Sequence, residues 1–175
     1  VLIDPVIMSA ERYAELERAT AGLDAADHPV AQRKNNWRDA DEMFDRFRDR
    51  PPFDSWNPAV LRDYCDYALL PPGKDGIRQL ACNPVNEASN YLNVNQTSAI
   101  LGRLHLITMP VALLRACPSA SEGPIVDFST SPTWPDLASA LPDCRDVYLP
   151  QLDHFIPMRD PELVASHIRQ ALEMS

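Results

Sequence analysis

The chain is 175 residues long, with 45% hydrophobic and 23% charged residues, a balance typical of one globular domain with a core of its own. Its net charge of −9 would repel the phosphates of DNA or RNA, so we expect no nucleic-acid partner. The sequence contains no apolar run of about 18 residues, so we expect no membrane span.

The cysteines lie far apart in the sequence and form no C-x-x-C pair, and no histidine stands at metal-ligand spacing from them. We interpret them as reduced, partly buried thiols of an intracellular protein, and expect a cytoplasmic location, no metal and no cofactor. Cys82 has no base beside it in the sequence, so we interpret it as a buried structural thiol and not as a nucleophile. The cysteines are Cys65, Cys82, Cys117 and Cys144.

The first residues, 1–5, have the pattern of a buried strand that ends at a proline. A domain rarely begins inside its own core, so we expect the chain to be the C-terminal piece of something longer. A helix is predicted next, over residues 9–26, because its first serine can cap it and Tyr13, Leu16 and Leu23 share one face.

Residues 9–103 are predicted to be mostly helical. Further helices are expected to begin after Asp39, Asn57 and Asn83, each a residue type that caps helix N-termini, and proline-containing breaks separate them. Most of the aromatic residues fall in this region. A block of helices between two strand-like runs indicates an insert in a sheet domain.

The pattern changes after this block. Residues 109–116 form a continuous apolar run of strand length, which favours a parallel strand covered on both faces. A helix to Leu141, a strand at 146–149 and a last helix over 160–173 follow. This alternation predicts an α/β fold with a parallel sheet. The last helix is expected to bury an apolar stripe: Val164, Ile168, Ala171 and Leu172.

His154 lies on the predicted loop between the strand at 146–149 and the last helix. An imidazole titrates near neutrality and can take and return a proton at cellular pH. Loops on a rigid scaffold often carry catalytic groups. His154 is therefore a candidate general base, although a histidine packed by loop hydrogen bonds fits the same local pattern.

Several stretches, in this order, resemble the C-terminal half of capped members of the α/β-hydrolase superfamily. Residues 1–5 resemble the sixth strand and residues 46–56 resemble cap sequence. Residues 110–115 resemble the seventh strand, and residues 147–155 resemble the eighth strand with the catalytic-histidine loop.

The resemblance implies a division of the chain into three parts. Residues 1–8 would be a core strand leading to the cap, 9–103 a helical cap, and 104–175 the C-terminal part of the hydrolase core. The expected fold is thus the C-terminal part of an α/β-hydrolase parallel sheet with a helical cap insert.

The nucleophile of this family is not found in the sequence. In the family it sits in a G-x-S-x-G elbow after the fifth strand, and none of the five glycines makes that motif. We therefore expect an N-terminal companion fragment or chain that carries the nucleophile and completes the sheet.

The acid that would orient His154 remains open between several carboxylates. We rank Asp127 first, because it lies in the loop after the seventh-strand stretch, where the family places its acid. Asp4 is the alternative, since some family members, including certain haloalkane dehalogenases, place the acid after the sixth strand. Glu122 ranks third. Asp153 directly precedes His154 in the sequence, and its side chain is expected to point away from the imidazole.

Aromatic residues of the expected cap, with one beside the histidine, are candidates for an apolar substrate pocket. Helical spacing also explains several of them as the cap's own core. The candidates for substrate binding are Trp37, Phe53, Trp56 and Phe155.

Three functions are compatible with this pattern. The first is a serine hydrolase of a hydrophobic small-molecule ester, thioester or lactone, in which this chain supplies the histidine and the acid. The second is an epoxide hydrolase or dehalogenase with an aspartate nucleophile. The third is a non-catalytic protein that binds small molecules on the same scaffold, since fold does not fix function.

Overall fold

The computed structural model describes residues 1–117 and 129–173. The chain divides into two units, each with its own contacts. One consists of residues 1–19 with 95–175 and is called the sheet unit below; the other consists of residues 20–94 and is called the helical unit. None of the described helices is long and apolar enough to cross a membrane.

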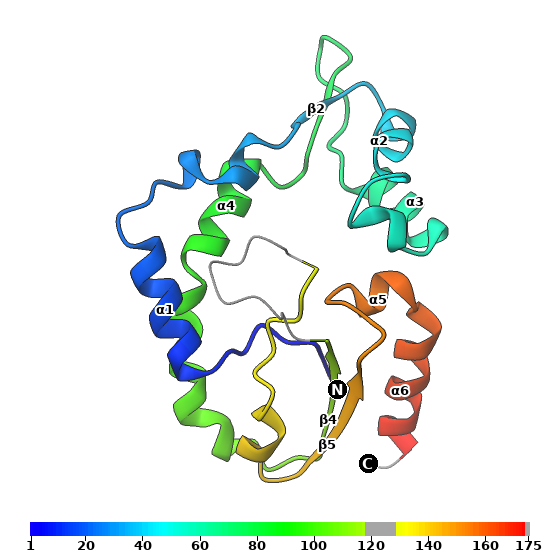
Figure 1. Cartoon of the computed structure of the whole chain (residues 1–175). Helices are drawn as coiled ribbons and strands as arrows, with labels where there is room; N and C mark the ends of the chain where they lie inside the picture. The colour runs from blue at the N-terminus through cyan, green and yellow to red at the C-terminus, as the bar shows by residue number, and fades with distance from the viewer. Residues whose placement is uncertain (118–128, 174–175) are drawn as a thin grey trace. The chain divides into compact units, whose positions relative to one another are not determined.

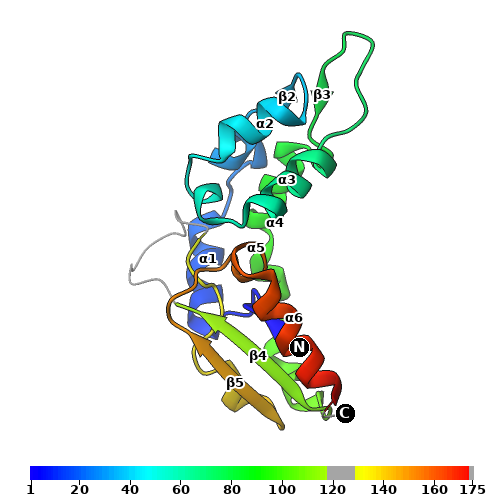
Figure 2. The ribbon, with the colours of Figure 1, turned by 90° about the vertical axis from the view of Figure 1, so that its right-hand side faces the viewer.

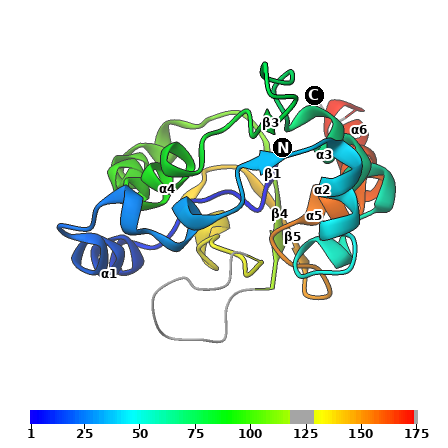
Figure 3. The same ribbon diagram turned by 90° about the horizontal axis from the view of Figure 1, so that it is seen from above.

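A parallel sheet forms the centre of the sheet unit (Figures 1 and 3). Within the described residues it contains three strands in the order β1–β4–β5. Leu2 of β1 lies opposite Leu113 of β4, and Leu114 of β4 lies opposite Val147 of β5. The predicted parallel α/β arrangement is confirmed. The strands are β1 (Leu2–Ile3), β4 (Val111–Ala116) and β5 (Cys144–Leu149).

The run predicted as a strand covered on both faces has this structure as β4. Alternate residues of a strand point to opposite faces. Leu113 packs in one cluster with Leu104 and Leu137, whereas Leu114 packs in another with Ile156 and Val164. Each face is thus covered by its own apolar layer, which explains why the run shows no polar alternation.

Helices and 3-10 helices surround this sheet, and Figure 2 shows α6 beside β4. Helix α6 starts after Asp160, whose carboxylate accepts the N–H of Leu163 at 2.9 Å. The α-helices of this unit are α1 (Ala10–Thr20), α5 (Ile156–Arg159) and α6 (Pro161–Glu173). The 3-10 helices are Val94–Leu106 and Leu137–Ala140.

Two helix predictions need correction. Helix α1 ends at Thr20 and not near residue 26, because Gly22 adopts a positive φ of 76° that stops the helix, and Leu23 is exposed. On α6 the predicted stripe is buried only at Val164, while Leu172 is 73% exposed. The stripe is therefore uncovered toward the end of α6 within the described residues.

The helical unit is built from capped helices and a short antiparallel strand pair, β2 with β3. Asp39 accepts the N–H of Glu42, and Asn57 and Asn83 cap the next two helices, as the sequence predicts. This strand pair was not predicted, because each of its strands is only two residues long. The α-helices are α2 (Ala40–Phe47), α3 (Pro58–Tyr67) and α4 (Pro84–Leu92). The strands are β2 (Asn36–Trp37) and β3 (Arg78–Gln79), and the 3-10 helices are Ala25–Asp27, Pro29–Gln32 and Phe53–Ser55.

An aromatic cluster forms much of the interior of the helical unit. The Phe47 and Phe53 rings stack with centroids 4.2 Å apart, and Trp37 packs edge-on against Phe47 at 5.4 Å. Trp56 contacts Phe53 at 4.9 Å. Such ring pairs contribute beyond the area that they bury, so they hold short helices together.

The cysteines form no disulfide among the described residues, and their environments differ. Cys65 is buried, and burial raises its pKa to about 11, so it is an inert thiol. Cys82, which the sequence led us to expect buried, is exposed. It lies between β3 and α4, where the helical unit does not cover it.

Candidate active site

Asp4 occupies the position directly after β1, where the chain leaves the sheet. Its backbone N–H still bonds to the carbonyl of Leu114 at 2.8 Å, and its φ of 40° turns the chain into the left-handed region. That region is uncommon for residues other than glycine, although aspartate tolerates it better than most. Asp4 is 1% exposed, so its carboxylate is placed inside the unit.

His154 lies on the loop between β5 and α5, and its ring meets this carboxylate. Nδ1 is 2.8 Å from Asp4 Oδ2, and the imidazole side chain is 30% exposed whereas that of Asp4 is 0% exposed. A carboxylate accepts hydrogen bonds, so Nδ1 carries the proton and Nε2 is the basic nitrogen of the neutral ring. The pair therefore has one buried and one accessible member.

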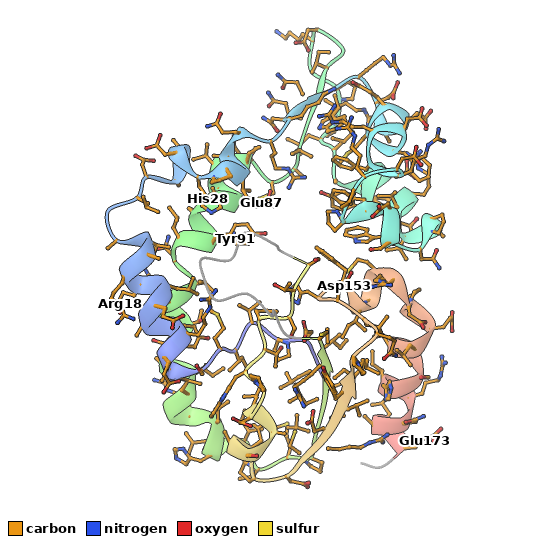
Figure 4. The ribbon with its side chains drawn as sticks, viewed as in Figure 1. Arg18, His28, Glu87, Tyr91, Asp153 and Glu173 are labelled. Carbon is orange, nitrogen blue, oxygen red and sulfur yellow. The ribbon has the colours of Figure 1, made fainter. Side chains whose placement is uncertain are left out.

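Backbone hydrogen bonds fix the loop that carries His154. The His154 N–H donates to the carbonyl of Ser129 at 2.6 Å, and the Cys117 N–H donates to that of Leu152 at 3.1 Å. Asp153 accepts the N–H of Phe155 at 3.0 Å and an Arg159 N–H at 3.1 Å. The side chain of Asp153, labelled in Figure 4, is thus engaged with α5 and not with the imidazole.

The second carboxylate oxygen of Asp4 is surrounded by donors. Oδ1 accepts the N–H of Ala116 at 2.9 Å and the hydroxyl of Ser131 at 2.6 Å, and Thr133 Oγ1 lies 3.2 Å away. Burial raises the pKa of Asp4, but the hydrogen bonds from His154, Ser131 and Ala116 outweigh it, so the pKa lies below its ordinary value of 3.8. Asp4 is therefore a carboxylate at neutral pH.

The arrangement can move a proton. A buried carboxylate at Nδ1 fixes the ring orientation and tautomer and stabilises the imidazolium that forms when Nε2 takes a proton. The strand topology explains why these groups meet: β1, β4 and β5 are parallel, and Asp4, the Ser131 segment and His154 each follow one of them. Loops after the carboxyl ends of parallel strands gather at the same edge of a sheet.

Solved structures share this architecture. The peroxisomal alpha-beta-hydrolase Lpx1 from Saccharomyces cerevisiae matches 98% of the chain with a TM-score of 0.61 and 12% identity. E-2-(acetamidomethylene)succinate hydrolase matches 95% of it with a TM-score of 0.57 and 17% identity. The chain has the fold of part of an α/β-hydrolase.

The chain spans about half the length of the structures that it matches, 42% of the first and 53% of the second. At these identities the likeness establishes the fold alone. No protein-family model and no curated protein sequence matches the chain.

The site geometry selects among the carboxylates that the sequence offers. Asp4, the alternative, makes the hydrogen bond to Nδ1 of His154. Asp127, ranked first from the sequence, and Glu122 lie outside the described residues. The contact thus favours Asp4 over the ranking drawn from the sequence. Ser131 and Thr133 were missed, although they belong to a hydroxyl-rich run, residues 129–133, that signals polar contacts.

The aromatic candidates separate into buried and partly buried positions. Trp37 is 1% exposed and Trp56 is 8% exposed, so both belong to the interior of the helical unit. Phe53 is partly buried in the same cluster. Phe155 is the candidate next to the histidine, with ring centroids 5.9 Å apart.

No metal site accompanies this pair in the described part of the chain. Within residues 1–117 and 129–173, no three histidine, cysteine, aspartate or glutamate side chains are grouped so that they could hold a metal ion.

Proposed function

We propose that this chain supplies the base and the acid of a hydrolase acting on a hydrophobic small-molecule ester, thioester or lactone. The observation that carries the proposal is the hydrogen bond between the buried, ionised Asp4 and Nδ1 of the partly exposed His154. Base, orienting acid and post-strand loops are the parts that acyl transfer requires beside a nucleophile.

Each residue has a defined role in the reaction. His154 Nε2 removes the proton of a serine hydroxyl as that oxygen attacks the acyl carbon, and then gives the proton to the leaving oxygen or sulfur. Asp4 stays ionised and stabilises the imidazolium between the two transfers. Water, activated by the same nitrogen, releases the acyl group in the second half of the cycle.

The nucleophile and the oxyanion donors are proposed to come from an N-terminal companion that completes the sheet. Within the described residues β1 has a neighbour only on its β4 edge. A cavity of about 650 Å³ opens beside it, lined by Ile3 and Ala112 of the sheet and by Ile168, Ala171 and Leu172 of α6. Uncovered apolar surface of this kind is typical of an interface.

The companion can be tested with surface variants. Leu172→Glu places a charge in the cavity lining, and we expect it to reduce the yield of complex when the two parts are co-expressed. Leu106→Glu changes another exposed leucine, 64% accessible and outside the cavity lining, and is the matched control. Equal yields from both variants would contradict this role of the cavity.

The helical unit is proposed to act as the cap that selects the substrate. The ring of Phe155 beside the histidine, in the sheet unit, supports an apolar substrate. Within the helical unit Phe53 is the remaining candidate, because Trp37 and Trp56 are buried in its interior.

A second candidate is an epoxide hydrolase or dehalogenase with an aspartate nucleophile. It is favoured by the position of Asp4, since an acid after the sixth strand is the arrangement that the resemblance to capped α/β-hydrolases associates with certain haloalkane dehalogenases. The same Asp4–His154 pair would then activate the water that hydrolyses the alkyl-enzyme ester.

The deciding experiment compares substrates for the complete protein that contains this chain. Nitrophenyl esters of increasing acyl length, a lactone, an epoxide and a haloalkane are assayed in parallel. We expect turnover of the esters, rising with apolar chain length. Turnover of the epoxide or haloalkane alone would favour the second candidate, and no turnover of any substrate would contradict the proposed enzyme.

A further inference from the structure

Two hydroxyl groups lie close to the Asp4 carboxylate, and their distances show which of them donates its hydrogen to it. Ser131 Oγ is 2.6 Å from Oδ1, and Thr133 Oγ1 is 3.2 Å from the same atom. Thr133 Oγ1 is also 2.7 Å from the carbonyl oxygen of Pro5. A hydroxyl has one hydrogen, so Thr133 gives its hydrogen to the nearer carbonyl.

The Ser131 hydroxyl, in contrast, donates its hydrogen to Asp4. Its Oγ accepts the N–H of Thr133 at 3.3 Å, which leaves its hydrogen for Asp4. Ser131 and Asp4 are both buried, at 8% and 1% exposure. In a site closed to water, a charge-assisted hydrogen bond at this distance is a strong one.

The segment that carries Ser131 also holds the histidine loop. The Ser131 N–H donates to the carbonyl of Cys117 at 3.2 Å, just after β4. The carbonyl of Ser129 accepts the N–H of His154 at 2.6 Å. The same short segment therefore binds the carboxylate through a side chain and the imidazole loop through its backbone.

We propose that Ser131 is a positioning residue, whose hydroxyl holds the Asp4 carboxylate in its ionised form and in register with Nδ1 of His154. The catalytic part of this inference rests on the proposed function. The effect on Asp4 does not, because it is a property of the described contacts alone.

The first test measures the ionisation of Asp4 by carbon NMR of its carboxyl group in the complete protein. Ser131→Ala removes the donor and leaves the Ala116 N–H on Oδ1, so the midpoint is expected to rise by about one unit. Ser131→Thr keeps the hydroxyl and is expected to restore the wild-type midpoint. If Ser131→Ala folds poorly, Ser131→Cys replaces it, because the thiol keeps a similar volume but is a weak donor. The midpoint of Asp4 is expected to rise in this variant too.

Two controls distinguish the hydroxyls. Thr133→Val should shift the midpoint less than Ser131→Ala, since Thr133 gives its hydrogen to Pro5. Ser139→Ala changes an exposed serine of the same unit and should leave it unchanged. A larger shift in the Thr133 variant, or none in the Ser131 variants, would overturn the assignment.

The second test concerns turnover. In an active complete enzyme, Ser131→Ala should lower kcat about tenfold at unchanged KM, with the acid side of the pH profile moved to higher pH, and Ser131→Thr should recover both. An Asp4 shift with unchanged kcat and pH profile would overturn the positioning role. An enzyme without hydrolytic activity would contradict the proposed function, while the NMR midpoint still decides the bond.

Discussion

The Asp4–His154 contact of the sheet unit and the Arg33–Glu87 contact of the helical unit have nearly the same length, 2.8 and 2.7 Å. Nη1 of Arg33 donates to both carboxylate oxygens of Glu87, and Nη2 donates to the hydroxyl of Tyr64 at 3.1 Å. Both partners of that pair are about one quarter exposed, whereas the carboxylate of Asp4 is closed off from water.

The comparison shows that chemical role depends on the partner and on burial, not on contact length. A guanidinium stays charged at every relevant pH, so Arg33 exchanges no proton and its contact with Glu87 holds α4 in place. In Figure 4, Glu87 and Tyr91 are labelled on α4 with His28 nearby, and the His28 and Tyr91 rings stack at 5.7 Å. An imidazole gains and loses its proton near neutrality, so the sheet unit holds the pair that can do chemistry.

The largest expected effect is at the base. His154→Ala in the complete enzyme should lower kcat by about 10⁴-fold, because proton transfer to and from the nucleophile is lost. His105→Ala changes an exposed histidine of the same unit and should keep wild-type turnover. A loss below about tenfold for His154→Ala would rule out general base catalysis by this residue.

The second largest effect on turnover is expected at the acid, Asp4. Asp4→Asn keeps the shape but removes the charge, and its amide can present a hydrogen to Nδ1 and so select the wrong tautomer. We expect kcat to fall by about 10³-fold, measured under saturating substrate. Asp136→Asn, an exposed residue whose side chain caps nothing, is the control. Similar kinetics for the two variants would return Asp127 to consideration.

The pH dependence of the free energy of unfolding tests the ionised state of Asp4. The pKa of Asp4 is lower in the folded state than its ordinary value of 3.8, so its ionised form stabilises the fold above that value. This contribution decreases as the pH falls through the folded-state pKa. Urea unfolding of wild type and Asp4→Asn should therefore differ most near neutrality and converge below about pH 4. A constant difference at all pH values would contradict it.

The smallest effect is expected in the helical unit. Glu87→Gln should reduce the free energy of unfolding by about 1 kcal/mol, since the pair is partly exposed and solvent screens it. Turnover should change less than about twofold. Glu15→Gln breaks the more exposed pair with Arg12 and should change the free energy of unfolding by less than about 0.5 kcal/mol. A large loss of turnover in Glu87→Gln would give this pair a part in substrate binding.

Much of the local structure could be predicted from the sequence because local rules decide it. Asn57 and Asn83 cap their helices through short hydrogen bonds to the backbone two residues later. The apolar run that became β4 was recognisable because burial on both faces removes polar alternation. Helix α1 ended early because Gly22 has a positive φ, a preference that amphipathic spacing does not report.

The sequence by itself determined the order of the three strands of the parallel sheet, the α/β class and the loop that carries His154, since apolar runs and helix caps are patterns of residues close together in the chain. Only the tertiary structure decided the partner of His154. Asp4 lies 150 positions away, and Ser131, which bonds the same carboxylate, lies 127 positions from it. Parallel pairing brings the ends of β1, β4 and β5 to one edge, and burial there makes one carboxylate the acceptor for hydroxyl, amide and imidazole. No local pattern contains that information, because each of these residues alone looks like an ordinary loop residue after a strand.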